Sequence, residues 1–432
     1  MQVPEPNEYN PDTLIDEQVT HAVTAGASTF AELLSSLPGI YPSIVVAAVR
    51  RLNLKRIIWI PGLFQATPAY PQSSTQLREK TSGLHLPVPH PLDYEWRFSK
   101  ETINYLLETC QKLTVEDDRI ALLGAPSVFA TGHEIAYPRH LILYDANPAL
   151  TARFDGLSEV IPCNLLTDSL PDVQVAAVLI DPPWYKEHIY AFLWAASRIC
   201  QIGGNILLSL PPIGTRPGIE KERDTLLDWA RQLGLELAEV LLASLTYLSP
   251  PFETNSLRAE CLIDVPSEWR HGDLFIFMVC HRHDTIRPIE MVREGQWDEV
   301  TLAGVRIRVL HSEEQTFRDP RLITIIPGDI LPSVSRRDRR RALAAVWTSG
   351  NRIFGCDGKA ILLHVLRALG ANTSPESVVA TFLRRNLSLD EKDLIIEASH
   401  QITELVNTEW AEYAGQSEAH MCLPENLAVR DK

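Results

Sequence analysis

The residues best suited to chemistry in this chain form one short stretch: Asp181-Pro182-Pro183-Trp184-Tyr185. It follows the continuous apolar run 175–180, which predicts a buried strand. Proline cannot donate to a strand ladder, so the strand must end there and the chain must turn out of the sheet. The Asp181 carboxylate and the Pro182 carbonyl are both acceptors, and together they can hold the two hydrogens of a planar amino group. The stretch therefore predicts amino-group recognition at the carboxyl edge of a strand, where open α/β sheets bind ligands.

The aromatic residues that follow the prolines have two interpretations. Trp184 or Tyr185 can stack on the ring that carries the amine. Alternatively, the strand ends in a simple proline turn and Trp184 packs as part of the core.

A second set of residues suits a nucleoside. The predicted strand 119–123 runs into the tight turn Gly124-Ala125-Pro126-Ser127, and the predicted strand 140–144 ends at Asp145, about 20 residues after the glycine. Glycine lets the backbone approach a ligand, and a carboxylate in this position can accept both ribose hydroxyls. The pattern G-x-G-x-x-G is absent, which argues against a dinucleotide.

Taken together, these signals resemble the class I S-adenosylmethionine-dependent methyltransferases over residues 119–285. The Asp-Pro-Pro-Trp turn matches the motif of the members that methylate an amino group of adenine or cytosine. The resemblance implies S-adenosylmethionine as cofactor, with Gly124 facing its methionine part, Asp145 its ribose and Asn164 its adenine edge. It also implies that Asp181 and the Pro182 carbonyl orient the acceptor nitrogen. Acceptors of this class include adenine N6 in nucleic acid. The chain departs from the family at residues 125–127, where a second glycine is usual.

Two other functions stay open. The synthases of branched polyamines, which transfer an aminopropyl group, have a similar layout, with a winged helix before a Rossmann-like domain that carries Asp-Pro-Pro-aromatic. Their glycine turn is rich in aspartate, whereas residues 124–127 contain no acid, so we favour methyl transfer. The third interpretation is a catalytically degenerate Rossmann-like scaffold in a multiprotein assembly. The altered glycine turn favours a scaffold, and the intact Asp181–Trp184 turn argues against one.

Alternating strands and helices predict a mostly parallel sheet. The predicted fold class is α/β: a Rossmann-like methyltransferase sheet with an N-terminal winged-helix-like domain and a C-terminal α+β extension. The predicted boundaries are 1–62 for the winged-helix-like domain, 63–98 for a proline-rich linker, 99–285 for the methyltransferase domain, 286–345 for a β-rich extension with an arginine cluster, and 346–432 for a helical region. We expect the aromatic segment 90–98 to pack against the catalytic domain.

The N-terminal region is predicted to form helices followed by a wing at residues 56–60. A winged helix can bind DNA through a recognition helix at 43–51, or it can serve protein contacts and dimerisation. Few cations lie nearby, so protein contacts are favoured; protein partners or a homodimer through the N- and C-terminal regions are expected. A second basic feature, the cluster Arg336, Arg337, Arg339, Arg340 and Arg341, suits either a phosphate or nucleic-acid contact or, as we favour, a solvated helix start.

The net charge, the cysteines and the lengths of the apolar runs argue against several functions and sites. The formal net charge of −15 disfavours tight non-specific binding to duplex nucleic acid, which requires basic surface. The seven cysteines form no C-x-x-C pair, which predicts reduced thiols, no zinc or other metal site, and a cytoplasmic location. No apolar run reaches the ~18 residues of a membrane span, and the polar first ten residues predict no signal peptide.

Overall fold

The computed structural model describes residues 11–37, 39–55, 86–170, 173–216, 218–261, 265–288 and 295–416. Three helices come first: α1 (Pro11–Thr24), α2 (Phe30–Ser36) and α3 (Pro42–Leu54). Helix α2 begins with a capping box, because the Thr29 and Glu32 side chains each accept from the other residue's backbone N–H. The predicted wing at 56–60 lies outside the described residues, so the winged helix stays a prediction.

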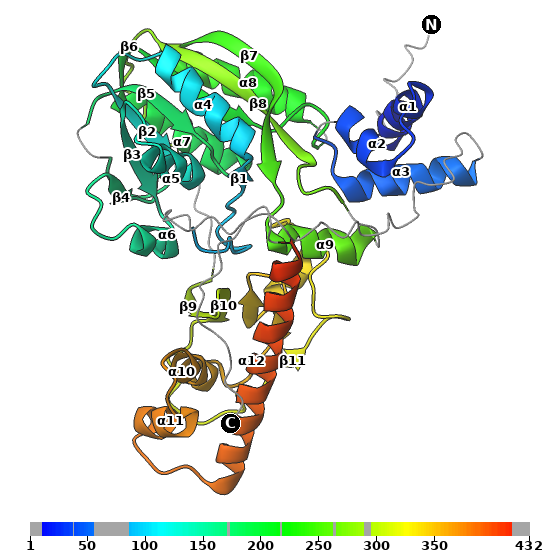
Figure 1. The fold of residues 1–432 in the computed structure, drawn as a ribbon, viewed down its shortest axis with the longest axis vertical. Coiled ribbons are helices and arrows are strands. Elements are labelled where there is room, and N and C mark those ends of the chain that lie inside the picture. Colours follow the sequence, from blue (N-terminus) through cyan, green and yellow to red (C-terminus); the bar gives the residue numbers. More distant parts are fainter. Residues whose placement is uncertain are drawn as a thin grey trace, which may run out of the picture.

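An eight-stranded sheet, in the upper left of Figure 1, has the strand order β1-β7-β8-β6-β5-β2-β3-β4. Its strands are β1 (Arg97–Phe98), β2 (Arg119–Leu123), β3 (His140–Asp145), β4 (Val160–Pro162), β5 (Val175–Ile180), β6 (Cys200–Leu210), β7 (Leu235–Leu248) and β8 (Arg270–Val279). The strands from β4 to β6 pair in parallel, and β8, β7 and β1 complete the sheet in antiparallel fashion. The α/β, Rossmann-like sheet predicted from the alternation of elements is therefore present.

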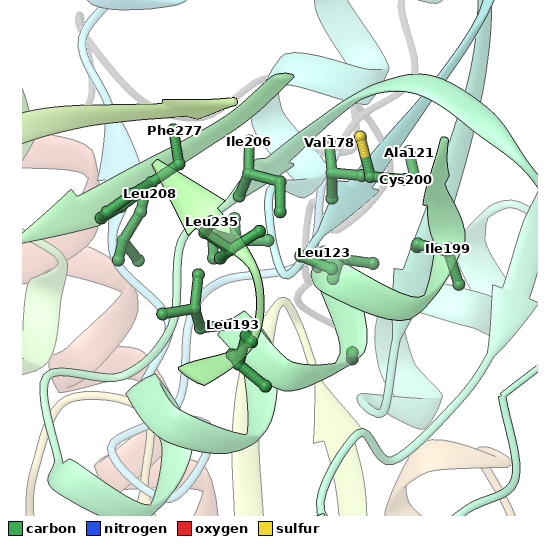
Figure 2. Close-up of a cluster of buried hydrophobic side chains, with 14 of the residues drawn as sticks. Ala121, Leu123, Val178, Leu193, Ile199, Cys200, Ile206, Leu208, Leu235 and Phe277 are labelled. Atoms are coloured by element: carbon green, nitrogen blue, oxygen red, sulfur yellow. The ribbon is translucent and has the colours of Figure 1, made fainter. Parts of the chain in front are cut away.

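Helices cover both faces of this sheet because successive strand side chains point to opposite sides. One face packs on α4 (Lys100–Lys112) and α5 (Pro126–Glu134), and the other on α7 (Lys186–Ile199) and α8 (Ile219–Gln232). Figure 2 shows the second of these cores, in which Leu193 of α7 lies beneath Val178 and Ile206 of the central strands. The short helix α6 (Pro148–Arg153) follows β3.

Two local predictions were wrong. Glycine is common at helix ends, so the sequence predicts that Gly203 and Gly204 close the helix after the Asp-Pro-Pro-Trp turn, but α7 ends at Ile199 and both glycines belong to β6. Gly204 is required there, since a Cβ would lie 2.5 Å from the Ala176 carbonyl oxygen of the neighbouring strand. Pro126 and Ser127 were assigned to a turn, but they begin α5, because proline suits the first position of a helix.

The C-terminal unit is built on a second, antiparallel sheet in the order β11-β13-β12-β10-β9. Its elements are β9 (Trp297–Leu302), β10 (Val305–Leu310), β11 (Ile323–Thr324), the 3-10 helix η1 (Arg339–Leu343), β12 (Val346–Thr348), β13 (Ile353–Gly355), α10 (Lys359–Gly370), α11 (Pro375–Leu383) and α12 (Leu389–Gln416). The alternation of apolar and polar residues over 299–310 predicts a hairpin, and β9 and β10 confirm it. The strands and helices share one hydrophobic cluster, and the predicted division at residue 345 runs between strands of this sheet.

Helix α9 (Pro251–Cys261) lies at the junction of the three parts (Figure 1). Its Leu257 and Cys261 pack with the N-terminal helices, and Asn255 Nδ2 donates to the Gly350 carbonyl of the C-terminal unit (2.9 Å). None of the described helices is both long enough and apolar enough to span a bilayer.

Candidate functional site

A cavity of about 520 Å³ opens at the carboxyl ends of β2, β3 and β5. The strand order reverses here, since β3 and β4 lie on one side of β2 while β5 and β6 lie on the other. Such a switch point is the place where open α/β sheets bind ligands. The cavity brings together eight residues that the sequence predicted from four separate stretches: Gly124, Asp145, Asn164, Asp181, Pro182, Pro183, Trp184 and Tyr185.

The rest of the predicted glycine turn does not line the cavity. Ala125 is buried at 1% exposure, and Pro126 and Ser127 belong to the buried face of α5. Gly124 itself has φ +69°, and its N–H donates to the Tyr144 carbonyl of β3 (3.0 Å). A Cβ at this position would lie 3.1 Å from both the Asp181 carbonyl oxygen and the Phe192 ring. Glycine therefore allows the ends of β2 and β5 to approach each other at the cavity wall.

Asp145 lies at the end of β3, where its Oδ1 accepts the N–H of Asn147 (2.8 Å). Burial raises the pKa of the Asp145 carboxyl to about 7, and the nearby Glu95 and Asp93 carboxylates raise it as well. Asn147 then begins α6, because its Oδ1 accepts the N–H of Ala149 (3.1 Å). Asp145 is thus a half-buried acceptor whose carboxylate is held by the turn that leads into α6.

Asn164 occupies the corresponding position after β4. Its Oδ1 accepts the N–H of Leu166 (3.0 Å), and its own N–H donates to Asp168 Oδ2 (2.8 Å). The side-chain oxygen is therefore used in a local turn, and the amide nitrogen is the polar group left to meet a ligand.

Asp181 is held from the antiparallel side of the sheet. Tyr247 of β7 donates its hydroxyl to Asp181 Oδ1 (2.6 Å), and Ser209 of β6 forms a hydrogen bond with the same Tyr247 hydroxyl. Burial raises the pKa of the Asp181 carboxyl to about 7, although the hydrogen bonds from Tyr247 and Ser209 act in the opposite direction. Sequence reasoning missed both partners because a Tyr and a Ser inside apolar strands carry no signal of their own.

The two aromatic residues of the motif each have a cation on one face. The Arg270 guanidinium lies 4.1 Å from the ring centre of Trp184 and 3.9 Å from that of Trp96, between the two indoles. Arg336 lies 3.6 Å from the ring centre of Tyr185. Any planar ligand must therefore use the opposite faces or the edges of these rings.

The remaining wall comes from segment 86–96 and the C-terminal unit. The segment contributes Asp93 and Glu95 to the cavity, and β10 contributes Arg308. The expectation that the aromatic stretch 90–98 packs against the Rossmann-like sheet domain holds for its end, since Phe98 lies in the core on the α4 side and Trp96 packs against that core. The start of the stretch, His90 and Leu92, packs instead with the C-terminal unit.

Several polar atoms in the cavity wall lack partners. Four buried side-chain atoms on residues that line it have no hydrogen-bond partner within the described chain: Glu95 Oε2, Tyr144 Oη, His188 Nδ1 and Arg270 Nε. Buried polar atoms are normally satisfied, so this concentration favours a polar ligand. Acceptors at Asp145 and Glu95 suit the ribose hydroxyls and the ammonium group of S-adenosylmethionine, and the residues present fit that cofactor. No metal-binding cluster of His, Cys, Asp or Glu occurs in the part of the chain that the structure describes.

The arginine cluster lies beside the cavity and is partly engaged. Arg336 forms an ion pair with Glu187, and Arg340 pairs with Asp338 (2.6 Å). Arg341 donates to the Val334 carbonyl (3.0 Å) and to the Tyr94 hydroxyl (3.2 Å). Arg337 and Arg339 are exposed. Three of the five side chains thus serve internal contacts.

Comparison with protein-family models gives no match to this sequence, and no curated protein sequence matches it. Among solved structures, the branched-chain polyamine synthase from Thermus thermophilus, crystallised with 5'-methylthioadenosine, is similar over 63% of this chain and 89% of its own, with 13% identity and a TM-score of 0.48. The N-methyltransferase NodS from Bradyrhizobium japonicum is similar over 42% of this chain and 96% of its own (13%, TM-score 0.29). The TehB-like S-adenosylmethionine-dependent methyltransferase from Corynebacterium glutamicum is similar over 40% and 86% (13%, TM-score 0.27). At these identities the similarities concern the fold alone.

Proposed function

We propose that the protein transfers the methyl group of S-adenosylmethionine to an amino nitrogen. The observation that carries the proposal is the meeting of Gly124, Asp145 and Asp181 in one cavity at the switch point of the sheet. Asp145 would accept the ribose hydroxyls, and Asn164 would meet the adenine edge. The bound cofactor would supply a methyl group bonded to a sulfonium sulfur. The sulfur is the leaving group, and it is a good one because it departs as a neutral thioether.

Asp181 and the Pro182 carbonyl would hold the two hydrogens of the acceptor amine and direct its lone pair at the reacting carbon. Tyr247 supports this role, because its hydroxyl fixes one oxygen of the Asp181 carboxylate. Positioning of this kind supplies much of the rate in a simple displacement. An exocyclic amine such as adenine N6, in nucleic acid or in a free nucleotide, is the acceptor that the Asp-Pro-Pro-Trp motif favours.

A calorimetric titration with S-adenosylmethionine tests the proposal. The unmodified protein should bind, and Asp145→Ala should weaken binding at least about tenfold through loss of charged hydrogen bonds. The matched control is Asp228→Ala. Asp228 is an exposed carboxylate on α8 that forms an ion pair with Arg231 and does not line the cavity. Absence of binding by the folded, unmodified protein would contradict the proposal and favour a scaffold.

Aminopropyl transfer to a polyamine is the second candidate, and a specific observation favours it. Four carboxylates line the cavity, from Asp93, Glu95, Asp145 and Asp181. The glycine turn lacks the acids expected for a polycation, but segment 86–96 supplies two from elsewhere. An aliphatic ammonium must lose a proton before it can attack, and Asp181, with its pKa raised to about 7, is suited to accept one.

Product analysis separates the two candidates. The protein is incubated with S-adenosylmethionine or with an aminopropyl sulfonium donor, each with adenine-containing DNA or with a triamine. Methylated adenine supports the first candidate. Appearance of 5'-methylthioadenosine with an extended polyamine supports the second and contradicts the first.

A further inference from the structure

The hairpin of β9 and β10 in the C-terminal unit reaches the loop that follows β3 in the Rossmann-like sheet. Arg306 of β10 is 1% exposed, although it is a charged residue. Its guanidinium pairs with Glu299 of β9 through two hydrogen bonds of 2.8 Å, and it also pairs with Asp93. Burial of this cation is thus compensated by two carboxylates from different parts of the chain.

From Asp93 the network continues directly to the proposed ribose acceptor. Asn147 Nδ2 donates to Asp93 Oδ2 (3.0 Å), and the N–H of Asn147 donates to Asp145 Oδ1 (2.8 Å). The path from Arg306 to Asp145 through Asp93 therefore consists of three hydrogen-bonded steps, each between groups that are buried or half-buried, and Arg306 also donates directly to Asn147 Oδ1 (3.5 Å). Arg308 supports it, since it donates to both Asp93 and Glu299.

Segment 86–96, which carries Asp93, is anchored in the same C-terminal unit. The Val88 carbonyl accepts from Arg306 (3.0 Å), and the Val88 side chain packs in the C-terminal core. His90 is fully buried, and its Nδ1 accepts the N–H of Leu92 (3.2 Å). Its Nε2 therefore carries the proton and donates to the Trp347 carbonyl of β12 (3.1 Å). The wall of the cavity is thus attached to the C-terminal sheet.

We propose that Arg306 is a positioning residue for the cofactor, and that the nucleotide end of the cavity is complete only while the C-terminal unit holds Asp93. The inference rests on the proposed role of Asp145. By linkage, cofactor that binds to the ordered loop must in turn stabilise the contact between the two units. The C-terminal unit is then part of the cofactor site and not an independent appendage.

Two variants of the 432-residue chain interrupt the network. Arg306→Met removes the buried cation. Asn147→Ser is milder, because serine still caps α6 but its shorter side chain lacks the Nδ2 donor that reaches Asp93. The matched control is Arg352→Met, which removes an arginine of the same unit that pairs with Glu412 and does not line the cavity.

The first measurement is calorimetric binding of S-adenosylmethionine to the folded variants. Arg306→Met and Asn147→Ser should each weaken binding about tenfold or more, while Arg352→Met binds like the unmodified protein. In turnover assays the Michaelis constant for the cofactor should rise while the rate at saturation is retained. Unchanged affinity in folded Asn147→Ser and Arg306→Met would overturn the inference.

The second measurement is amide hydrogen exchange without ligand. Exchange at residues 145–150 should rise in both variants and stay unchanged in Arg352→Met, and unchanged exchange there in both variants would also overturn the inference. If the unmodified protein does not bind S-adenosylmethionine, the proposed function fails, but this second measurement still decides whether the C-terminal unit orders the loop.

Discussion

Asp181 in the cavity and Glu409 in the C-terminal unit have almost the same chemical surroundings. Tyr247 donates to Asp181 (2.6 Å) and forms a hydrogen bond with Ser209. Tyr413 likewise donates to Glu409 (2.7 Å) and forms a hydrogen bond with a serine, Ser349 (2.9 Å). Burial raises the pKa of both carboxyls to about 7.

The two sites differ in access. Glu409 also accepts from the Thr348 hydroxyl and from the Gly350 N–H (3.0 Å), and a Cβ at Gly350 would lie 2.6 Å from its carboxyl carbon. The Glu409 side chain is fully buried. Asp181 instead lines the cavity beside Pro182. A perturbed pKa and a tyrosine partner therefore do not by themselves mark a functional acid, because a structural carboxylate can have both; space for a ligand makes the difference.

Removal of the two carboxylates should separate their roles most clearly. Asp181→Ala should reduce transfer ~10²–10³-fold, because the acceptor amine loses its alignment, while cofactor binding stays near normal. Glu409→Ala should retain activity per folded molecule but lose roughly 3 kcal/mol of unfolding free energy, because several buried donors lose their acceptor. Turnover assays, calorimetry and urea unfolding provide these values. An Asp181→Ala variant with normal turnover would make the two sites equivalent and contradict the proposed role.

Removal of the tyrosine hydroxyls gives a smaller and sharper contrast. Tyr247→Phe and Tyr413→Phe should each lower the unfolding free energy by about 1–2 kcal/mol, since each removes a hydroxyl that forms hydrogen bonds with a carboxylate and a serine. Only Tyr247→Phe should also slow transfer, by about tenfold, because Asp181 is then less firmly oriented. The stability loss serves as the internal control. Equal turnover in the two variants would assign Tyr247 a purely structural role.

The pH dependence of the unfolding free energy should show the smallest difference. Both carboxyls take up a proton on folding, because the pKa rises from 3.8 for Asp181 and 4.5 for Glu409 to about 7. The unfolding free energy should therefore fall as the pH rises from about 4 to 7, with a contribution from each group, and Glu409→Gln should flatten that fall.

The rate should depend on Asp181 alone. With an ionised Asp181 required for transfer, kcat should fall about tenfold per pH unit well below pH 7. Assays must use saturating S-adenosylmethionine, because the pKa of Asp145 is also raised to about 7. The profile of Glu409→Gln should match that of the unmodified protein. A shifted midpoint in this variant would show that the two sites are coupled.

The sequence by itself determined the central elements and the motif that they present. The apolar run before Asp181 and the two prolines after it dictate a buried strand and a turn, whatever surrounds them. The same local rules identified Gly124 and Asp145 as strand-end residues and the hairpin of β9 and β10. They failed at Gly203 and Gly204, where the close approach of Ala176 from the next strand decides the conformation.

Only the tertiary structure decided which residues complete the site. Tyr247 lies 66 positions from Asp181, and Arg306 lies 213 positions from Asp93. Neither partner has a local signature, because a buried polar residue is explained only by the group that satisfies it. Local propensities fix where strands end, whereas pairing across the fold fixes what faces those ends. The chemistry of the cavity depends on both.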